Sequence, residues 1–140
     1  MKLERDQVAA YWEMITKTLI VDEFIEYDQT YLNNMLERFL KGILVCWIAV
    51  KGQEAKAVIM TGLEVDPGGV RSLLIHNLYG VTNISLADWK QGFEKLSLYA
   101  ERQRCKFIVA YSDVQRLIKL AEAFGGETSS RVLRIPINKE

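Results

Sequence analysis

The only histidine of the chain, His76, stands in the apolar run SLLIHNLYG. An imidazole with an unperturbed pKa near about 6.5 can accept a proton at neutral pH, so His76 is a candidate general base. Glu64, at the end of the preceding apolar run, could remove a proton through a water molecule. A strand histidine bound to a neighbour and a solvated acid beside a turn are the structural alternatives, and residue type alone does not decide between them.

A second candidate site is the stretch HNLYGVTNISLADW, residues 76–89, which runs from an apolar strand through a short loop into a helix. The N-terminus of a helix offers unpaired N–H groups and a partial positive charge, which suit a phosphate. Junctions that bind phosphate are usually rich in glycine because the phosphate approaches the backbone closely. This junction has only Gly80, and Ser85 could either contact a phosphate or cap the helix.

Several other kinds of site have no motif in the chain. There is no P-loop, no GxGxxG, no HExxH and no cluster of cysteine and histidine. Cys46 and Cys105 are far apart in sequence and are predicted to be free thiols in a reducing compartment. Eighteen basic and eighteen acidic residues cancel, so no nucleic acid or membrane partner is expected. The charged start and the short apolar runs predict a cytoplasmic protein.

The elements that must position these residues begin with two helices. Apolar residues recur at helical spacing over residues 4–19 and again over residues 27–42, where Gly42 predicts the end of the second helix. The first stripe, which should pack on a sheet, consists of Val8, Tyr11, Trp12, Ile15 and Leu19.

A sheet follows the two helices. Residues 43–65 read as two strands around the turn KGQE, and the turn DPGG at 66–69 leads to a third strand at 71–79. These runs predict an antiparallel meander. The nearly continuous apolar character of the third strand predicts a central position that is covered on both faces.

The last third of the chain alternates between helices and strands. Ser85 and Asp88 resemble a capping box and predict the start of a helix, while KFIVAYS, residues 106–112, predicts a short buried strand. A helix ending at Gly125 and a strand at 131–138, with Pro136 at an edge or a bulge, complete the chain. The helix after Ser85 carries a stripe that is expected in the core and consists of Leu86, Trp89, Phe93, Leu96 and Ala100.

The chain of 140 residues is therefore predicted to be one α+β domain, residues 1–140, with the order α-α-β-β-β-α-β-α-β. The strands at 71–79 and 107–111 are joined through a helix and should be parallel, so the sheet should be mixed. Helices flank this central mixed sheet.

This order, together with SLLIHNLYG, KFIVAYS and LIKLAEAFGGE, resembles the GNAT N-acetyltransferase superfamily from about Ile43 onward. The resemblance implies an acyl-CoA N-acyltransferase that transfers an acetyl or other acyl group to an amine acceptor, with acetyl-CoA or another acyl-CoA as cofactor. It also implies that the loop entering the helix at Ser85 holds the pyrophosphate. The residues that this assigns to the cofactor are Tyr79, Val81, Thr82, Asn83, Ser85 and Ala87.

The chain departs from the family pattern at two places. The family stretch [RQ]-x-x-G-x-[GA] aligns with TNISLA, where only Ala87 satisfies it and Thr82 and Ser85 do not. The tyrosine that many members carry on the last helix is replaced by Ala121 or Leu120. Tyr111 and Tyr79 are the substitutes that lie nearby in sequence.

Two hypotheses stay open at this stage. The first is an active N-acyltransferase. The second is a catalytically inactive GNAT-like protein that serves as an interaction or assembly component, as in small proteins of phages, and that binds a protein partner. The terminal strand could also pair two copies in a homodimer.

Overall fold

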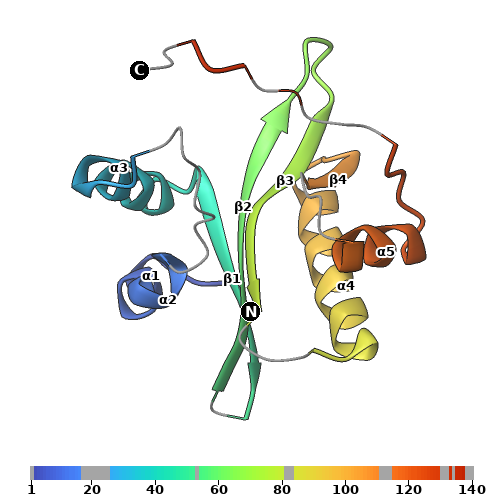
Figure 1. The fold of residues 1–140 in the computed structure, drawn as a ribbon, viewed down its shortest axis with the longest axis horizontal. Coiled ribbons are helices and arrows are strands. Elements are labelled where there is room, and N and C mark those ends of the chain that lie inside the picture. Colours follow the sequence, from blue (N-terminus) through green and yellow to red (C-terminus); the bar gives the residue numbers. More distant parts are fainter. Residues whose placement is uncertain are drawn as a thin grey trace. The chain divides into compact units, whose positions relative to one another are not determined.

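The computed structural model describes residues 2–16, 26–52, 54–80, 84–110, 115–129, 133 and 135–137, and Figure 1 shows the ribbon. The chain divides into two compact units, residues 1–109 and 110–140. No described helix is both long enough and apolar enough to span a membrane.

Nine elements are described, and almost all belong to the first unit. They are α1 (Arg5–Ala10), α2 (Trp12–Thr16), α3 (Gln29–Leu40), β1 (Leu44–Lys51), β2 (Glu54–Val65), β3 (Arg71–Gly80), α4 (Leu86–Arg102), β4 (Phe107–Ala110) and α5 (Gln115–Ala123).

The four strands form one mixed sheet in the order β1-β2-β3-β4. β2 pairs antiparallel with both β1 and β3, as the predicted meander requires. The N–H of Lys106, just before β4, donates to the carbonyl of Arg71, the first residue of β3, at 2.8 Å. β3 and β4 therefore start at the same end of the sheet, which confirms the parallel pair predicted from the helical crossover.

The predicted turns are confirmed, and their residues explain them. Gly52 has φ +65° in the hairpin between β1 and β2. In the turn between β2 and β3, Asp66 Oδ1 accepts the N–H groups of Gly68 and Val70, each at 2.9 Å. Gly69 completes that turn with φ +83°, a conformation that favours glycine.

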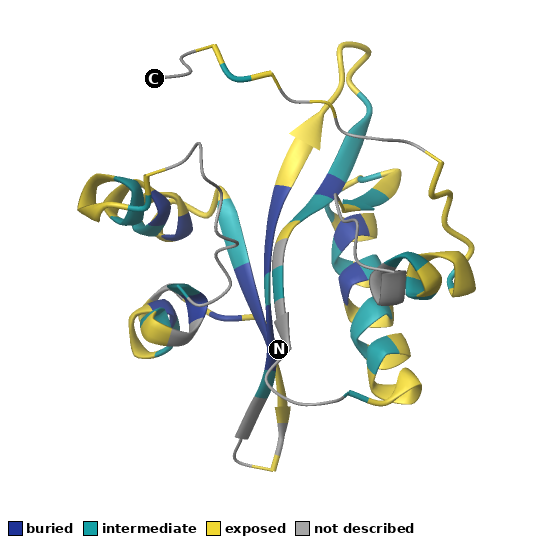
Figure 2. Ribbon diagram, in the orientation of Figure 1, coloured by how far each residue is buried: buried dark blue, intermediate teal, exposed yellow. Residues whose placement is uncertain are grey.

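The sheet separates two hydrophobic clusters. In the first unit, α1, α2 and α3 lie on one face of the sheet and α4 lies on the other (Figure 1). Figure 2 shows buried residues in the middle of the sheet and on the helix sides that face it. The cluster under α1, α2 and α3 contains Leu3, Val8, Ile15, Met35, Phe39, Cys46, Ile48, Val58 and Met60. The cluster under α4 contains Trp47, Leu73, Leu96 and Ala100.

A buried polar link joins β1 and β2. The indole N–H of Trp47 donates to Thr61 Oγ1 at 3.0 Å, and the Thr61 hydroxyl donates to the carbonyl of Val45 at 3.1 Å. Thr61 is completely buried, so these two bonds satisfy a hydroxyl that water cannot reach.

The first predicted helix is interrupted. Tyr11 separates α1 from α2, and Leu19 lies outside the described residues. The apolar stripe is otherwise confirmed, because Val8 and Ile15 are buried and Tyr11 and Trp12 pack against them.

Three expectations about burial are wrong in part. β3 is central, but only Leu73 among its described side chains is fully buried, and His76 is exposed. Phe107 in KFIVAYS is 55% exposed because β4 is the last strand of the described sheet and lacks a neighbour on its outer side. Leu86 is 62% exposed because it is the first residue of α4 and precedes the part of the helix that is buried on the sheet.

The predicted strand at 131–138 is not present in its described residues, which are 133 and 135–137. Their large apolar side chains, Leu133, Ile135 and Ile137, are 78% to 93% exposed. Alternation of apolar residues provides one face for a strand, but a strand also needs a neighbour that completes its backbone hydrogen bonds.

Candidate functional site

The junction between β3 and α4 is built around Ser85, the N-cap of α4. The Ser85 hydroxyl accepts the N–H of Asp88 at 3.1 Å, and the Ser85 carbonyl accepts the N–H of Trp89 at 3.0 Å. The predicted cap is therefore confirmed. Ser85, Leu86, Ala87 and Asp88 are all exposed, so this helix end is open to solvent.

The exposed N-terminus of α4 has features that favour the binding of an anion and one feature that opposes it. Seventeen aligned residues give the helix N-terminus a partial positive charge. The small side chain of Ala87 lets an anion approach the first turn, and the Ser85 hydroxyl keeps its own proton to donate. Asp88, in the same turn, adds a negative charge that opposes an anion.

Several residues assigned to this site from sequence are not located by the structure. Val81, Thr82, Asn83 and Tyr111 lie outside the described residues. Tyr79 is placed as a β3 residue opposite Val58 in β2.

His76 stands at an irregularity of β3. In the pairing with β2, Ile75 lies opposite Thr61 and Asn77 lies opposite Met60, so His76 has no opposite residue. This is a β-bulge, which redirects the side chain of the extra residue. Along the strand, His76 is four residues from Gly80, or about 13 Å from the end of β3 at a rise of about 3.3 Å per residue.

The imidazole of His76 lies over Gly62 of β2. An alanine Cβ at position 62 would be 2.8 Å from His76 Nε2 and 3.4 Å from His76 Cδ2. Leu44 is the other neighbour of this space, since its Cδ2 would be 3.4 Å from the same Cβ. One edge of the ring is therefore covered while the rest of the side chain is exposed.

This setting favours the neutral imidazole. Partial burial lowers the pKa of His76 below its usual 6.5, and the positive charge of Arg38 lowers it further. The carboxylate of Glu64, two residues beyond Gly62, opposes this shift and raises the pKa. His76 is thus neutral at pH 7 and can accept a proton, with Glu64 close enough to stabilise the imidazolium that forms.

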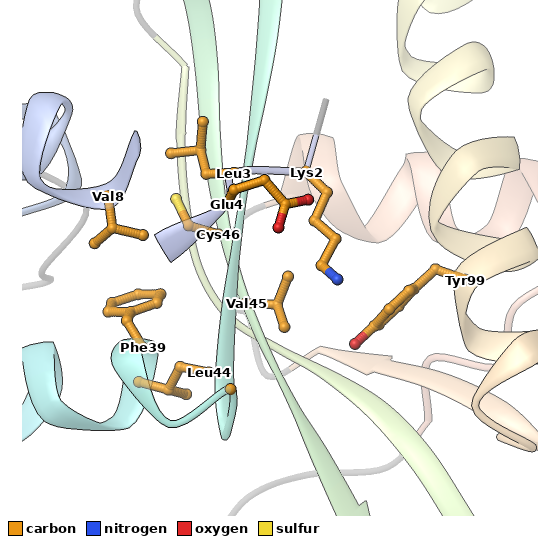
Figure 3. Close-up of a pocket in the computed structure, with 10 residues that line it drawn as sticks. Lys2, Leu3, Glu4, Val8, Phe39, Leu44, Val45, Cys46 and Tyr99 are labelled. Atoms are coloured by element: carbon orange, nitrogen blue, oxygen red, sulfur yellow. The ribbon is translucent and has the colours of Figure 1, made fainter. Parts of the chain in front are cut away.

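A cavity of about 210 Å³ lies elsewhere, along the outer edge of β1. Figure 3 shows the apolar side chains Val8, Phe39 and Leu44 on one side of β1 and Lys2 and Tyr99 on the other. Beside the cavity, the first described residues of the chain pair with β1 at a bridge between Lys2 and Trp47, and the N–H of Leu3 donates to the carbonyl of Cys46 at 2.8 Å. Among the predicted site residues that the structure describes, none lines this cavity.

Gly62 and the bulge at His76 were missed by the sequence reasoning. A signal was present, because Gly62 interrupts the apolar strand sequence AVIMTGLEV. An isolated glycine in a strand often marks a bulge or a close approach of another group.

Comparison by sequence finds no matching family model and no matching curated protein. Comparison of structures finds similar folds among acetyltransferases. A predicted acetyltransferase from Clostridium acetobutylicum, solved with acetyl-CoA, has a TM-score of 0.73 and 14% identity over 98% of this chain and 94% of its own.

Two further solved structures are similar over nearly their whole length. An aminoglycoside N-acetyltransferase in complex with CoA has a TM-score of 0.72 and 13% identity over 99% of this chain and 98% of its own. A ribosomal-protein-alanine N-acetyltransferase from Brucella melitensis has a TM-score of 0.66 and 16% identity over 96% of this chain and 98% of its own. At these identities the similarity establishes the fold.

Proposed function

We propose that this chain, which has the GNAT acyltransferase fold, transfers an acyl group from an acyl-CoA thioester to the nitrogen of an amine. The observation that carries the proposal is the junction from β3 to α4, where an exposed helix N-terminus follows a strand that carries a neutral histidine. Solved structures of this fold that bind acetyl-CoA or CoA support the choice of cosubstrate.

The residues that would hold the pyrophosphate are Ser85 and Ala87, at the start of α4. The Ser85 hydroxyl would donate to a phosphate oxygen while its lone pair caps Asp88. The exposed methyl group of Ala87 would leave the first-turn N–H groups accessible. The Asp88 carboxylate would weaken this binding by repulsion, which predicts a modest affinity rather than a tight one.

The acyl-CoA would supply an acyl group activated as a thioester. His76 would accept a proton from the acceptor amine, whose lone pair forms the new bond from nitrogen to the acyl carbon. The bond from carbon to sulfur breaks with its electron pair on sulfur, and the proton held by His76 is passed to this thiolate. Glu64 would stabilise the imidazolium between the two proton transfers.

The cosubstrate site can be tested by binding alone. Ala87→Glu adds bulk and a negative charge in the first turn of α4, and it should weaken acetyl-CoA binding at least tenfold in calorimetry. Gln91→Glu is the matched control, because it adds the same charge at an exposed position one turn further along α4. Absence of acetyl-CoA or longer acyl-CoA binding to the wild-type chain at millimolar concentration would overturn the proposal and leave the inactive, partner-binding alternative.

The chemistry can be tested by turnover. His76→Ala should lower kcat/KM by about 10²- to 10⁴-fold, the usual contribution of a general base. Because the pKa of His76 is lowered, the neutral base persists below pH 6.5, and the rate should fall only as the pH drops below that value. If kcat/KM of the wild-type chain already decreases on acidification at a pH above 7, the assignment of His76 is contradicted.

The proposal specifies the chemical class of the acceptor, which is an amine. Amines to screen are an aminoglycoside and a peptide with an N-terminal alanine, since acetyltransferases of both kinds share this fold. A polyamine extends the panel to flexible cations. Release of CoA thiol in the presence of each amine, with mass spectrometry of the acylated product, identifies the acceptor class.

A further inference from the structure

We infer that Gly62 is a positioning residue for His76, because the imidazole lies in the space that a side chain at position 62 would occupy. The inference rests on the proposed function only for its catalytic consequence. The placement of the ring is a property of the folded chain and can be tested without any cosubstrate.

Space, rather than backbone conformation, is what requires a glycine at position 62. Positive φ values are found at four other glycines, Gly42, Gly52, Gly69 and Gly125, and not at Gly62. The backbone at position 62 could therefore accommodate alanine. The Cβ of that alanine would lie 2.8 Å from His76 Nε2, a separation that real Cβ atoms do not tolerate, so the imidazole would have to move.

The bulge makes this contact possible. His76 is the extra residue of β3 opposite β2, and its ring extends over Gly62. Leu44 of β1 also borders the space above Gly62. The imidazole of β3 thus occupies space that the glycine of β2 leaves open, and a single methyl group at position 62 would close that space.

The charges that act on the ring come from two elements. Glu64 of β2 favours the imidazolium, and Arg38 of α3 disfavours it. These are the charged groups that influence His76 within the part of the chain that the structure describes. Burial of the ring edge has the largest effect and lowers the pKa of His76. Moving the ring away from Gly62 into water should therefore raise that pKa toward its usual value.

A titration of one residue tests the placement. His76 is the only histidine, so the imidazole ring protons of the chain give a single set of nuclear magnetic resonance signals. Gly62→Ala should raise the pKa of His76. Gly92→Ala makes the same chemical change in α4, where an added Cβ would meet nothing within 4 Å, and should leave that pKa unchanged. An unchanged pKa in folded Gly62→Ala would overturn the inference.

A second measurement keeps the test decisive if Gly62→Ala does not fold. In the wild-type chain, the ring protons of His76 should give nuclear Overhauser contacts to the α protons of Gly62, because the imidazole lies over that residue. If these contacts are absent, the ring does not lie over Gly62 and the inference is wrong.

The catalytic consequence is tested by a double-mutant cycle. Gly62→Ala should lower kcat/KM by up to about 10²-fold, as expected for a catalytic group displaced by about 1 Å. In the His76→Ala background, Gly62→Ala should cause no further loss. An equal loss in both backgrounds would show that Gly62 acts independently of His76. If the wild-type chain shows no turnover, the proposed function fails, while the titration still decides the role of Gly62.

Discussion

At the scale of single residues, burial favours the neutral form of two groups that could otherwise react. It lowers the pKa of His76, so that the neutral imidazole predominates at neutral pH. It raises the pKa of the Cys46 thiol to about 12, even though hydrogen bonding to the backbone at Trp47 acts in the opposite direction. The same physical effect keeps the histidine unprotonated and the cysteine thiol protonated, and the protonated thiol is inert.

The inertness of Cys46 can be measured by alkylation. Cys105 is half-buried and Cys46 is 1% exposed, and neither is in a disulfide. Brief treatment of the native chain with N-ethylmaleimide at pH 7.5 should give a single adduct at Cys105, and two adducts should appear after unfolding in urea. Cys105→Ser should give no adduct in the native state. Rapid native modification of Cys46 would contradict its burial.

At the scale of elements, three helices end in the same hydrogen-bonded arrangement, but with different residues. After α3, Gly42 adopts φ +77°, and after α5, Gly125 adopts φ +84°. After α4 the equivalent residue is Arg104, with φ +60°, whose N–H donates to the carbonyl of Glu101 at 3.0 Å. The next N–H, of Cys105, donates to the carbonyl of Ala100 at 2.8 Å and completes a Schellman motif.

The arginine in this motif carries backbone strain that glycine would relieve. A left-handed residue other than glycine costs about 1–2 kcal/mol, partly offset by the greater freedom of glycine in the unfolded chain. Arg104→Gly should therefore increase the free energy of unfolding by about 0.5–1 kcal/mol in urea denaturation. Arg102→Gly, within α4, should lower it by a similar amount, about 0.5–1 kcal/mol. A lower stability of Arg104→Gly would show that the arginine side chain makes a contact that outweighs the strain.

This helix end also shows how far local sequence patterns predict structure. Gly42 and Gly125 adopt the positive φ of a helix C-terminus, and Ser85 caps a helix N-terminus. These residue types are typical of such positions, so the three helix ends could be predicted. Arg104 adopts the left-handed conformation that a glycine usually adopts at this position of a helix end. The helical pattern of residues 85–104 predicts that the helix ends near Cys105, but no glycine in the sequence indicates the left-handed conformation of Arg104.

The same distinction applies to the candidate site. The helix start at Ser85 and the strand that carries His76 follow from capping and apolar runs, and both were predicted. The bulge was not, because it depends on how β2 and β3 pair over many residues. The exposure of Phe107 likewise depends on its place in the strand order, which local patterns do not contain.

At the scale of the whole molecule, the sheet of the first unit is the shared wall of two hydrophobic clusters. β1 contributes Ile48 to the cluster under α1, α2 and α3, and Trp47 to the cluster under α4. Because neighbouring residues of the same strand belong to different clusters, neither cluster can lose its packing without affecting the other. The two clusters should therefore unfold together.

Truncation of one residue in each cluster tests this coupling. Ile48→Ala and Leu73→Ala remove side chains that are each 1% exposed, and each should lower the free energy of unfolding by about 2–5 kcal/mol. Tryptophan fluorescence and far-ultraviolet circular dichroism should give coincident urea transitions for both variants. Val65→Ala, at a side chain that is 59% exposed, should change stability by less than about 0.5 kcal/mol. Separate transitions would show that the two clusters are independent.

The position of β2 between the two clusters has a consequence for genetic variation. Strands with one wet face accept substitutions at every second residue, but residues 57–62 of β2 are buried at all positions except Ile59, which is half-buried. In a saturation screen scored by abundance, this segment should lack the alternating tolerance that edge strands show. Each of its positions should reject charged residues, with Gly62 further restricted to the smallest side chain.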